Sequence, residues 1–256
     1  MNRMVIAIVL GFSAVLSGCV VKETRPLAKL EAVQAKTQIP EAELLDVALR
    51  HFDPGVPVNL ANDEEALDKR RIYPDVRSAE SRLLPMRLRT TLEASGQWGA
   101  VRVVPEAVQF VDVIVTGKIV ESTGSRLELA ITAVDASGRV WIKERFYSSD
   151  ADLGAYKTDA SLRARDPFQN VYSQIANDLV TARDALTAVE KRELRHIAQL
   201  RFAQDLDPRS FDGYLQRSAD GRYRLTRLPA TDDPAVVRIT KIRERDSAVI
   251  DTLDGY

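Results

Sequence analysis

The stretch VDVIVTGKIVESTGSRLELAITAVDASGRVWIKERFY, residues 111–147, decides the fold of this 256-residue chain. Apolar residues occupy every second position in three runs, which predicts three strands that each bury one face. These residues are Val111, Val113 and Val115, then Leu127, Leu129, Ile131 and Ala133, then Val140, Ile142 and Phe146. The segments 122–125 and 135–138 between the runs each contain a glycine and predict tight turns. The stretch therefore predicts an antiparallel meander whose apolar face must be covered by helices.

Two amphipathic segments can supply this cover. In the second, Asp166 and Pro167 are expected at the N-cap and first helical positions. Its apolar residues recur at spacings of four and three: Phe168, Tyr172, Ile175, Leu179, Ala182, Leu186 and Val189. Such a repeat suits a coiled coil or a helix lying on a sheet, and the meander favours the second. If the helix continued over 167–205, it would be longer than a small sheet is wide. We therefore expect its end to project or the helix to bend near Ala188.

The first cover helix is expected from Ser78 onward and ends at Gly96. Its apolar stripe comprises Leu84, Leu88, Leu92 and Ser95, joined by Leu83 and Met86. Pro85 lies inside this segment, so the helix either starts near Pro85 or kinks there.

The remaining segments complete an α+β protein. We expect strands at 44–52 and 101–104, an irregular loop at 56–75, a hairpin around Asp220-Gly221, and a last helix from Asp233-Pro234. The predicted organisation is a signal peptide at 1–18, a tether at 19–40, a sheet-and-helix domain at 41–190, and a helix and hairpin extension at 191–256.

The amino terminus has the pattern of an export signal. Arg3 precedes an apolar run from Met4 to Leu16, which at about 1.5 Å per residue is too short to span a bilayer. The following Leu16-Ser17-Gly18-Cys19 resembles the bacterial lipobox, and Cys19 is the single cysteine of the chain. The resemblance implies cleavage before Cys19 and attachment of acyl chains such as palmitate, which would hold the protein at a membrane. A spanning anchor and an ordinary secretory signal are the alternatives.

The residue after Cys19 bears on which membrane the lipoprotein is expected to reach. In lipoproteins of this kind an Asp at that position favours inner-membrane retention, and this chain has Val20. We therefore expect the periplasmic face of the outer membrane, with the inner membrane as the less favoured location.

Composition excludes several classes of function. The formal net charge is −1, which gives no support for binding nucleic acid. Two histidines and one cysteine cannot form an internal disulfide or a Cys/His zinc site, so we expect no metal and no cofactor.

The middle of the chain is similar to a known periplasmic pattern. Its short motifs are SGQWGAVRVV at 95–104, VIVTG at 113–117 and VDASGRVW at 134–141. They resemble the amino-terminal domain of TolB-like proteins and the auxiliary lipoproteins of ABC-type transport systems. The resemblance implies a small mixed sheet with two helices on one face, a role in envelope assembly or transport, and no catalytic residues.

No familiar catalytic motif is present in the sequence. His51 and His196 stand apart from any Ser or Cys nucleophile, and the acids at 63–65 and 232–233 are typical of solvated loops. The basic run 69–71 could meet anionic lipid headgroups or simply flank a loop.

The third meander strand offers a candidate partner-binding surface. If Val140, Ile142 and Phe146 face the core, the residues between them share the outer face of the sheet. These residues are Trp141, Lys143, Arg145 and Tyr147. An aromatic and cationic face suits a protein or anionic partner, although an ordinary solvated sheet face has the same pattern.

The sequence thus favours a non-enzymatic, membrane-anchored lipoprotein that acts as an adaptor or auxiliary factor for an envelope protein. Two alternatives stay open. A cell-wall or lipid hydrolase would need an acid pair or a His–acid pair in a cleft, and a carrier of lipid or small ligands would need an apolar cavity.

Overall fold

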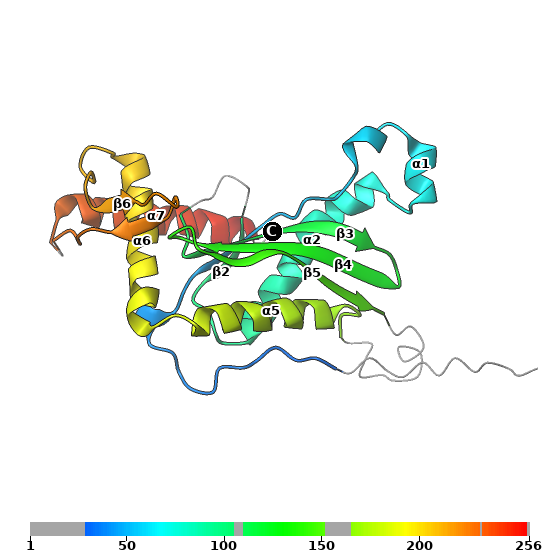
Figure 1. Ribbon diagram of the computed structural model, residues 1–256, viewed down its shortest axis with the longest axis horizontal. Helices are drawn as coiled ribbons and strands as arrows, with labels where there is room; N and C mark the ends of the chain where they lie inside the picture. Colours follow the sequence, from blue (N-terminus) through cyan, green and yellow to red (C-terminus); the bar gives the residue numbers. More distant parts are fainter. Residues whose placement is uncertain (1–28, 105–109, 152–164, 231, 255–256) are drawn as a thin grey trace, which may run out of the picture.

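The computed structural model describes residues 29–104, 110–151, 165–230 and 232–254. Five strands form one sheet in the order β2-β1-β3-β4-β5 (Figure 1). Their bounds are β1 Val47–Arg50, β2 Val101–Val104, β3 Val113–Ser122, β4 Arg126–Asp135 and β5 Val140–Asp150. β1 pairs in parallel with β2 and β3, whereas β3, β4 and β5 form the antiparallel meander. The sheet is therefore mixed, and the three strands of residues 111–147 are its larger part.

Two helices lie against this sheet and enclose the main core. α2 (Pro74–Ala94) contacts β1, β2 and β3, and α5 (Gln169–Asp184) contacts β4 and β5. The two helices also contact each other, so they form one layer. Fully buried residues fill the interface, among them Leu49, Leu88, Val115, Leu129 and Ile175. The α+β class predicted from the sequence is confirmed.

α2 continues through Pro85 without ending there. Proline has no N–H, so Pro85 cannot donate to the carbonyl of Ser81 four residues earlier. That carbonyl instead accepts a hydrogen bond from the backbone N–H of Phe52, just after β1, at 2.9 Å. The proline thus frees an acceptor that connects the helix to the sheet.

Two details of the cover helices differ from the prediction. Leu83 and Met86, expected in the buried stripe of α2, are exposed because the stripe follows Leu84 and Leu88. Asp166 is not the N-cap of α5, since the helix begins at Gln169 and Asp166 accepts from the N–H of Phe168 in the preceding turn.

The long predicted helix is broken between α5 and α6 (Ala188–Leu206). Thr187 accepts from the N–H of Glu190, whose carboxylate accepts from the N–H of Thr187, so a capping box starts a new helix. α6 runs in a different direction from α5 and leads away from the core (Figure 1). The bend expected near Ala188 is thus a complete break, because residues 185–187 separate the two helices.

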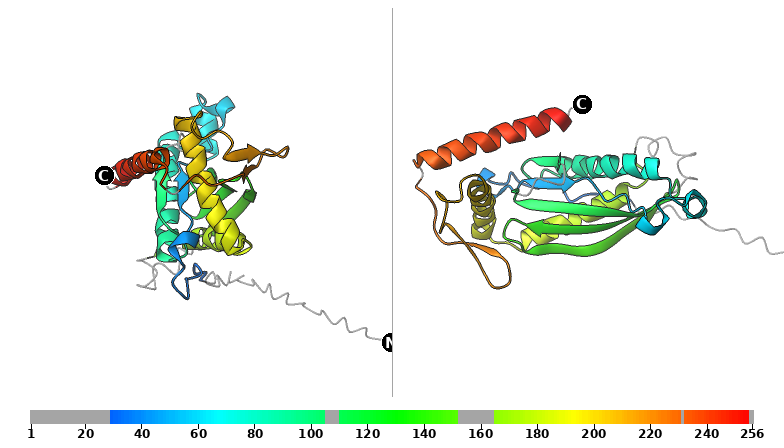
Figure 2. Two further views of the ribbon diagram at one scale, coloured as in Figure 1. Left: turned by 90° about the vertical axis from the view of Figure 1, so that its left-hand side faces the viewer. Right: turned by 90° about the horizontal axis from the view of Figure 1, so that it is seen from above.

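The carboxyl-terminal part adds a hairpin and a helix. β6 (Leu215–Arg217) and β7 (Tyr223–Leu225) form a separate two-stranded sheet that packs on α6. α7 (Pro234–Asp254) contacts α6 and the edge strand β2, and lies apart from α5 (Figure 2). Arg102 of β2 holds it through two hydrogen bonds to Asp251, at 2.6 and 3.0 Å.

The segment before β1 is attached to the fold over part of the predicted tether. Leu30 and Val33 donate their N–H groups to Asn170 and Asn177 of α5, at 3.0 and 2.8 Å. Ala32 is buried between them. Residues 19–28 lie outside the described residues. For these residues alone, the tether stays a prediction.

The segment 41–73 contains three short helices. The turn η1 (Glu41–Glu43) precedes β1, and η2 (Val58–Leu60) and α1 (Glu64–Lys69) lie in the loop that the sequence predicts as irregular. Asp63 caps α1 by accepting from the N–H of Ala66 at 3.0 Å. The loop and α1 project beside the start of α2 (Figure 1).

Candidate functional site

The strand that carries the predicted partner-binding residues is bulged. In the pairing of β4 with β5, Ile131 lies opposite Arg145 and Ala133 opposite Ile142, so β5 holds an extra residue. Glu144 lies in this bulge with φ of 39°. A bulge reverses which side chains face the core, because side chains alternate along a strand. The prediction that Trp141, Lys143, Arg145 and Tyr147 share one outer face is therefore wrong.

Trp141 belongs to the end of the core. Its indole N–H donates to Asp135 at 2.9 Å, and its ring lies 6.4 Å from that of Trp98. Arg183 stacks over Trp98 at 5.4 Å and donates to the carbonyl of Gln97. These partners give both tryptophans structural roles.

Tyr147 is buried on the helix side of the sheet. Its hydroxyl donates to Asp178 of α5 at 2.7 Å, and burial together with this carboxylate raises the pKa of the phenol. Arg145 reaches the same carboxylate at 2.6 Å. Lys143 is exposed, as Arg145 is, but forms no ion pair with a described residue.

The structure identifies a different set on the open face of the sheet. Val140 and Phe146, expected in the core, are 51% and 59% exposed on the side away from α2 and α5. The cross-strand pairs place further residues beside them, and we call the whole set the outer sheet face. It consists of Ile114, Thr116, Lys118, Ala130, Thr132, Val134, Val140 and Phe146. The face is mostly apolar, which suits contact with another protein.

A second candidate is a cavity of about 280 Å³ beside the starts of β1 and β3. Arg192, Arg195, His196 and Gln199 of α6 line one side, Arg243 of α7 lines another, and Ala42, Asp46 and Asp112 complete it. Arg192 pairs with Glu43 at 3.3 Å, and Arg195 donates to the carbonyl of Glu41. The cavity thus brings three guanidinium groups and two carboxylates together.

Asp112 is the most perturbed acid of the described residues. One oxygen accepts the N–H of Asp46 at 2.9 Å, and the other has no hydrogen-bond partner among the described residues. Burial raises its pKa from 3.8 to about 6, in spite of Arg195 and Arg243 nearby. A buried carboxyl with a raised pKa is a frequent feature of functional sites, although structural acids show it too.

The cavity also tests the requirements of the hydrolase alternative. His196 lies there with Asp46 and Asp112, and burial and Arg195 lower the pKa of its imidazole. The described lining contains no Ser, Thr, Cys or Lys that could serve as a nucleophile. His51 is exposed elsewhere, and the acids at 63–65 lie on the surface at the start of α1.

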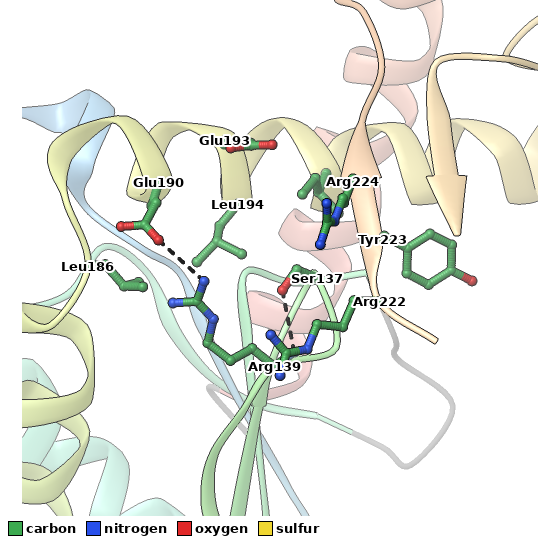
Figure 3. A pocket seen from close by; sticks show the side chains of 10 residues that line it. Ser137, Arg139, Leu186, Glu190, Glu193, Leu194, Arg222, Tyr223 and Arg224 are labelled. Atoms are coloured by element: carbon green, nitrogen blue, oxygen red, sulfur yellow. Dashed lines mark hydrogen bonds and ion pairs between the residues drawn. The ribbon is translucent and has the colours of Figure 1, made fainter. Parts of the chain in front are cut away.

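The carboxyl-terminal part lines further cavities among the described residues. One, of about 300 Å³, lies between the β4–β5 turn, α6 and β7 (Figure 3). Arg139 reaches across this cavity and donates a hydrogen bond to the carboxylate of Glu190 at 3.3 Å. Arg222 and Arg224 extend into view from the hairpin (Figure 3). A second, of about 260 Å³, separates α7 from β1 and β2 and is lined in part by Val104, Phe202 and Ile250. A third, also of about 260 Å³, lies between α6 and α7 and is lined mostly by apolar residues such as Leu200, Phe211 and Ile239. The apolar space that a carrier needs is thus found beside α7, away from α2 and α5.

Two further observations concern metals and membranes. The described residues contain no group of three or more His, Cys, Asp or Glu side chains placed to hold a metal ion. Within the same residues, no helix has the length and hydropathy to cross a membrane. Cys19 lies outside the described residues, so its acylation stays a prediction.

The molecule is thus an α+β protein with a mixed five-stranded sheet, a two-helix cover and a helical extension. No family model matches the chain, and no curated protein matches it either. Among solved structures it is similar to a PelC dodecamer from Paraburkholderia phytofirmans, with 16% sequence identity and a TM-score of 0.32. The alignment covers 57% of this chain and 94% of that one. A likeness at this level supports no conclusion about family or function.

Proposed function

We propose that the protein is a lipid-anchored lipoprotein on the periplasmic face of the outer membrane. The observation that carries the proposal is the sequence Leu16-Ser17-Gly18-Cys19 at the end of a short apolar run, with Cys19 as the single cysteine. Its support from the structure is the attachment of residues 30–33 to α5 and of Ala35 to Ser95 at the end of α2, which leaves about ten residues between Cys19 and the fold. Such a spacer keeps the folded part close to the membrane.

At the membrane the protein acts as a non-enzymatic adaptor or auxiliary factor for another envelope protein. The outer sheet face supports this role, since Val140 and Phe146 offer an apolar contact surface beside Lys118. Apolar patches rimmed by polar groups are typical of protein interfaces.

Anchoring is tested by labelling cells with radioactive palmitate and separating their membranes. The wild-type protein should carry label and sediment with the outer membrane, whereas Cys19→Ser should lose the label and either leave the membrane or retain its leader. Ser13→Ala, in the leader but outside the lipobox, should behave as the wild type. Unlabelled wild-type protein in the soluble fraction would refute the proposal.

The adaptor role is tested with a photo-crosslinking residue placed at Phe146 and, as control, at the exposed Val237 of α7. In intact cells we expect one defined adduct with an envelope protein from position 146, none from position 237, and loss of the adduct in Val140→Glu. Equal labelling from both positions would contradict the role of the outer sheet face.

The hydrolase alternative is favoured by one observation, the meeting of His196 with Asp46 and Asp112 in a cavity. It predicts that His196→Ala abolishes hydrolysis of cell-wall or lipid substrates while the fold is retained. An adaptor tolerates this substitution.

A further inference from the structure

The side of α2 that faces away from the sheet carries an apolar stripe among polar residues. Val76, Ala79, Leu83 and Met86 follow one another at intervals of three and four residues, which places them on one face of the helix. Val76, Leu83 and Met86 are 51%, 47% and 45% exposed. The solvent side of a helix in a soluble protein is normally polar, so this stripe needs an explanation.

Arginines border the stripe on both sides. Arg82 is exposed and forms no ion pair with a described residue, while Arg87 and Arg89 pair with Asp166 and Glu93 at 3.5 and 2.8 Å. Two further cations, Arg70 and Arg71, are exposed just before α2 begins, while the neighbouring Lys69 pairs with Glu65 at 2.7 Å. An apolar stripe between basic side chains is the pattern of a helix that lies on an anionic membrane surface.

The amino-terminal segment meets the fold beside this helix. Leu30 is bound to Asn170, near the start of α5, at 3.0 Å. Gln169, at the start of α5, bonds Thr91 of α2 at 2.9 Å, and Asp166 in the turn before α5 pairs with Arg87 of α2. Leu30 and Val33 are themselves partly exposed apolar residues, at 38% and 48%.

The residues between Cys19 and Leu30 are long enough to extend along the whole stripe. About ten residues separate Cys19 from Lys29 and span at most about 35 Å when extended. α2, with 21 residues, is about 32 Å long. An acylated Cys19 can thus hold a membrane against the outer side of α2.

We propose that the stripe Val76–Ala79–Leu83–Met86 and its arginines dock the folded part onto the membrane in which the acyl chains of Cys19 are inserted. The proposal rests on the acylation proposed above. It fixes the orientation of the molecule, because the helix layer then faces the lipid and the outer sheet face points away from it, towards a protein partner.

The test uses the full acylated protein in vesicles of phosphatidylethanolamine and phosphatidylglycerol. A nitroxide is attached in Met86→Cys or, as control, in Val140→Cys, and collisions with a water-soluble nickel chelate and with oxygen are compared. We expect the label at 86 to collide with nickel roughly fivefold less often than the label at 140, because it lies at the boundary of headgroups and acyl chains. Adding Leu83→Glu should restore nickel access at 86, whereas adding Phe146→Glu should not.

Each outcome has a defined meaning. Protein that floats with the vesicles but shows equal nickel access at both positions overturns the docking and leaves the anchor intact. Protein that does not float overturns both proposals. Spin–spin broadening at 86 on vesicles shows that a second copy of the chain covers the stripe, which also overturns the docking.

Discussion

Asp112 shows how a single residue shapes the pH dependence of stability. Its folded-state pKa is raised to about 6, so the folded state binds the proton more tightly than the unfolded state. The free energy of unfolding therefore falls as the pH rises from about 4 to 6, and the penalty is fully present above pH 6.

Asp112→Asn removes this penalty and keeps an oxygen to accept the N–H of Asp46. We expect it to raise the free energy of unfolding at pH 7.5 by about 2–3 kcal/mol, since each pKa unit corresponds to about 1.4 kcal/mol. Urea unfolding between pH 4 and 8 measures the gain, which should vanish at pH 4. The exposed Asp246→Asn is the control, and a less stable Asp112→Asn at pH 7.5 would refute the expectation.

Gly55 lies after β1 at a φ of 67°, where a Cβ would stand 1.9 Å from the carbonyl oxygen of Ile119. Because that oxygen belongs to the backbone of β3, the clash cannot be relieved by a side-chain rotation. Gly55→Ala should lower the free energy of unfolding by about 3 kcal/mol. Gly124→Ala, in an open turn with nothing within 4 Å, should change it little, and equal losses in thermal unfolding would contradict the explanation.

Residue-level environments were harder to predict from the sequence than the strands that contain them. Period-two alternation placed Leu129, Ile131 and Ile142 in the core correctly, because cross-strand pairing keeps them on one face. It failed for Phe146 and Tyr147, since one extra residue at Glu144 reverses the alternation. The residue types around Glu144 give no indication in the sequence that the strand is bulged there.

Among the elements, the break between α5 and α6 depends on a cap that the apolar repeat conceals. The hydrophobic spacing continues from Leu179 through Leu186 to Val189, but Thr187 and Glu190 form the reciprocal bonds that start α6. Thr-x-x-Glu is a recognisable signal, and it outweighs the repeat because it satisfies two backbone N–H groups. Val189 is consequently 63% exposed instead of buried.

Thr187→Ala should therefore destabilise α6 and the hairpin that packs on it. We expect a loss of about 1 kcal/mol in the free energy of unfolding, as for other N-caps. Hydrogen exchange should accelerate in 188–206 and 215–225 more than in the sheet. Thr181→Ala, inside α5 where the hydroxyl bonds the carbonyl of Asn177, is the matched control. Uniform acceleration across the molecule would show that the cap acts on the whole fold.

The cavity lined by Arg192, Arg195 and Arg243 illustrates what the sequence cannot reveal at the level of elements. Its residues come from η1, the starts of β1 and β3, α6 and α7, and no spacing relates them in the chain. In the sequence, His196 is a candidate by its residue type alone. Its proximity to Asp112 depends on how α6 leaves the core and on how α7 returns beside β2.

At the scale of the whole molecule, hydrogen bonds hold the segment before β1 to the fold. Asn170 and Asn177 bind the backbone of residues 30–33, and Asn177 also donates to the carbonyl of Glu31 at 3.1 Å. The sequence predicts a tether in this region because residues 20–40 are polar and bounded by prolines. Amide side chains on the outside of α5 carry no hydrophobic signal, so the attachment could not be predicted.

The double substitution Asn170→Ala and Asn177→Ala should release this segment and leave the core unchanged. Both side chains lie outside the main core, so we expect the midpoint of thermal unfolding to shift by no more than about 2–3 °C. Trypsin should then cut after Lys36 several times faster than in the wild type, because proteolysis requires the segment to leave the surface. Thr181→Ala on the same helix should not change the cleavage rate. If the double variant were cut as slowly as the wild type, Ala32 and the bond from Ala35 to Ser95 would suffice to hold the segment, and the spacer available to Cys19 would still be about ten residues.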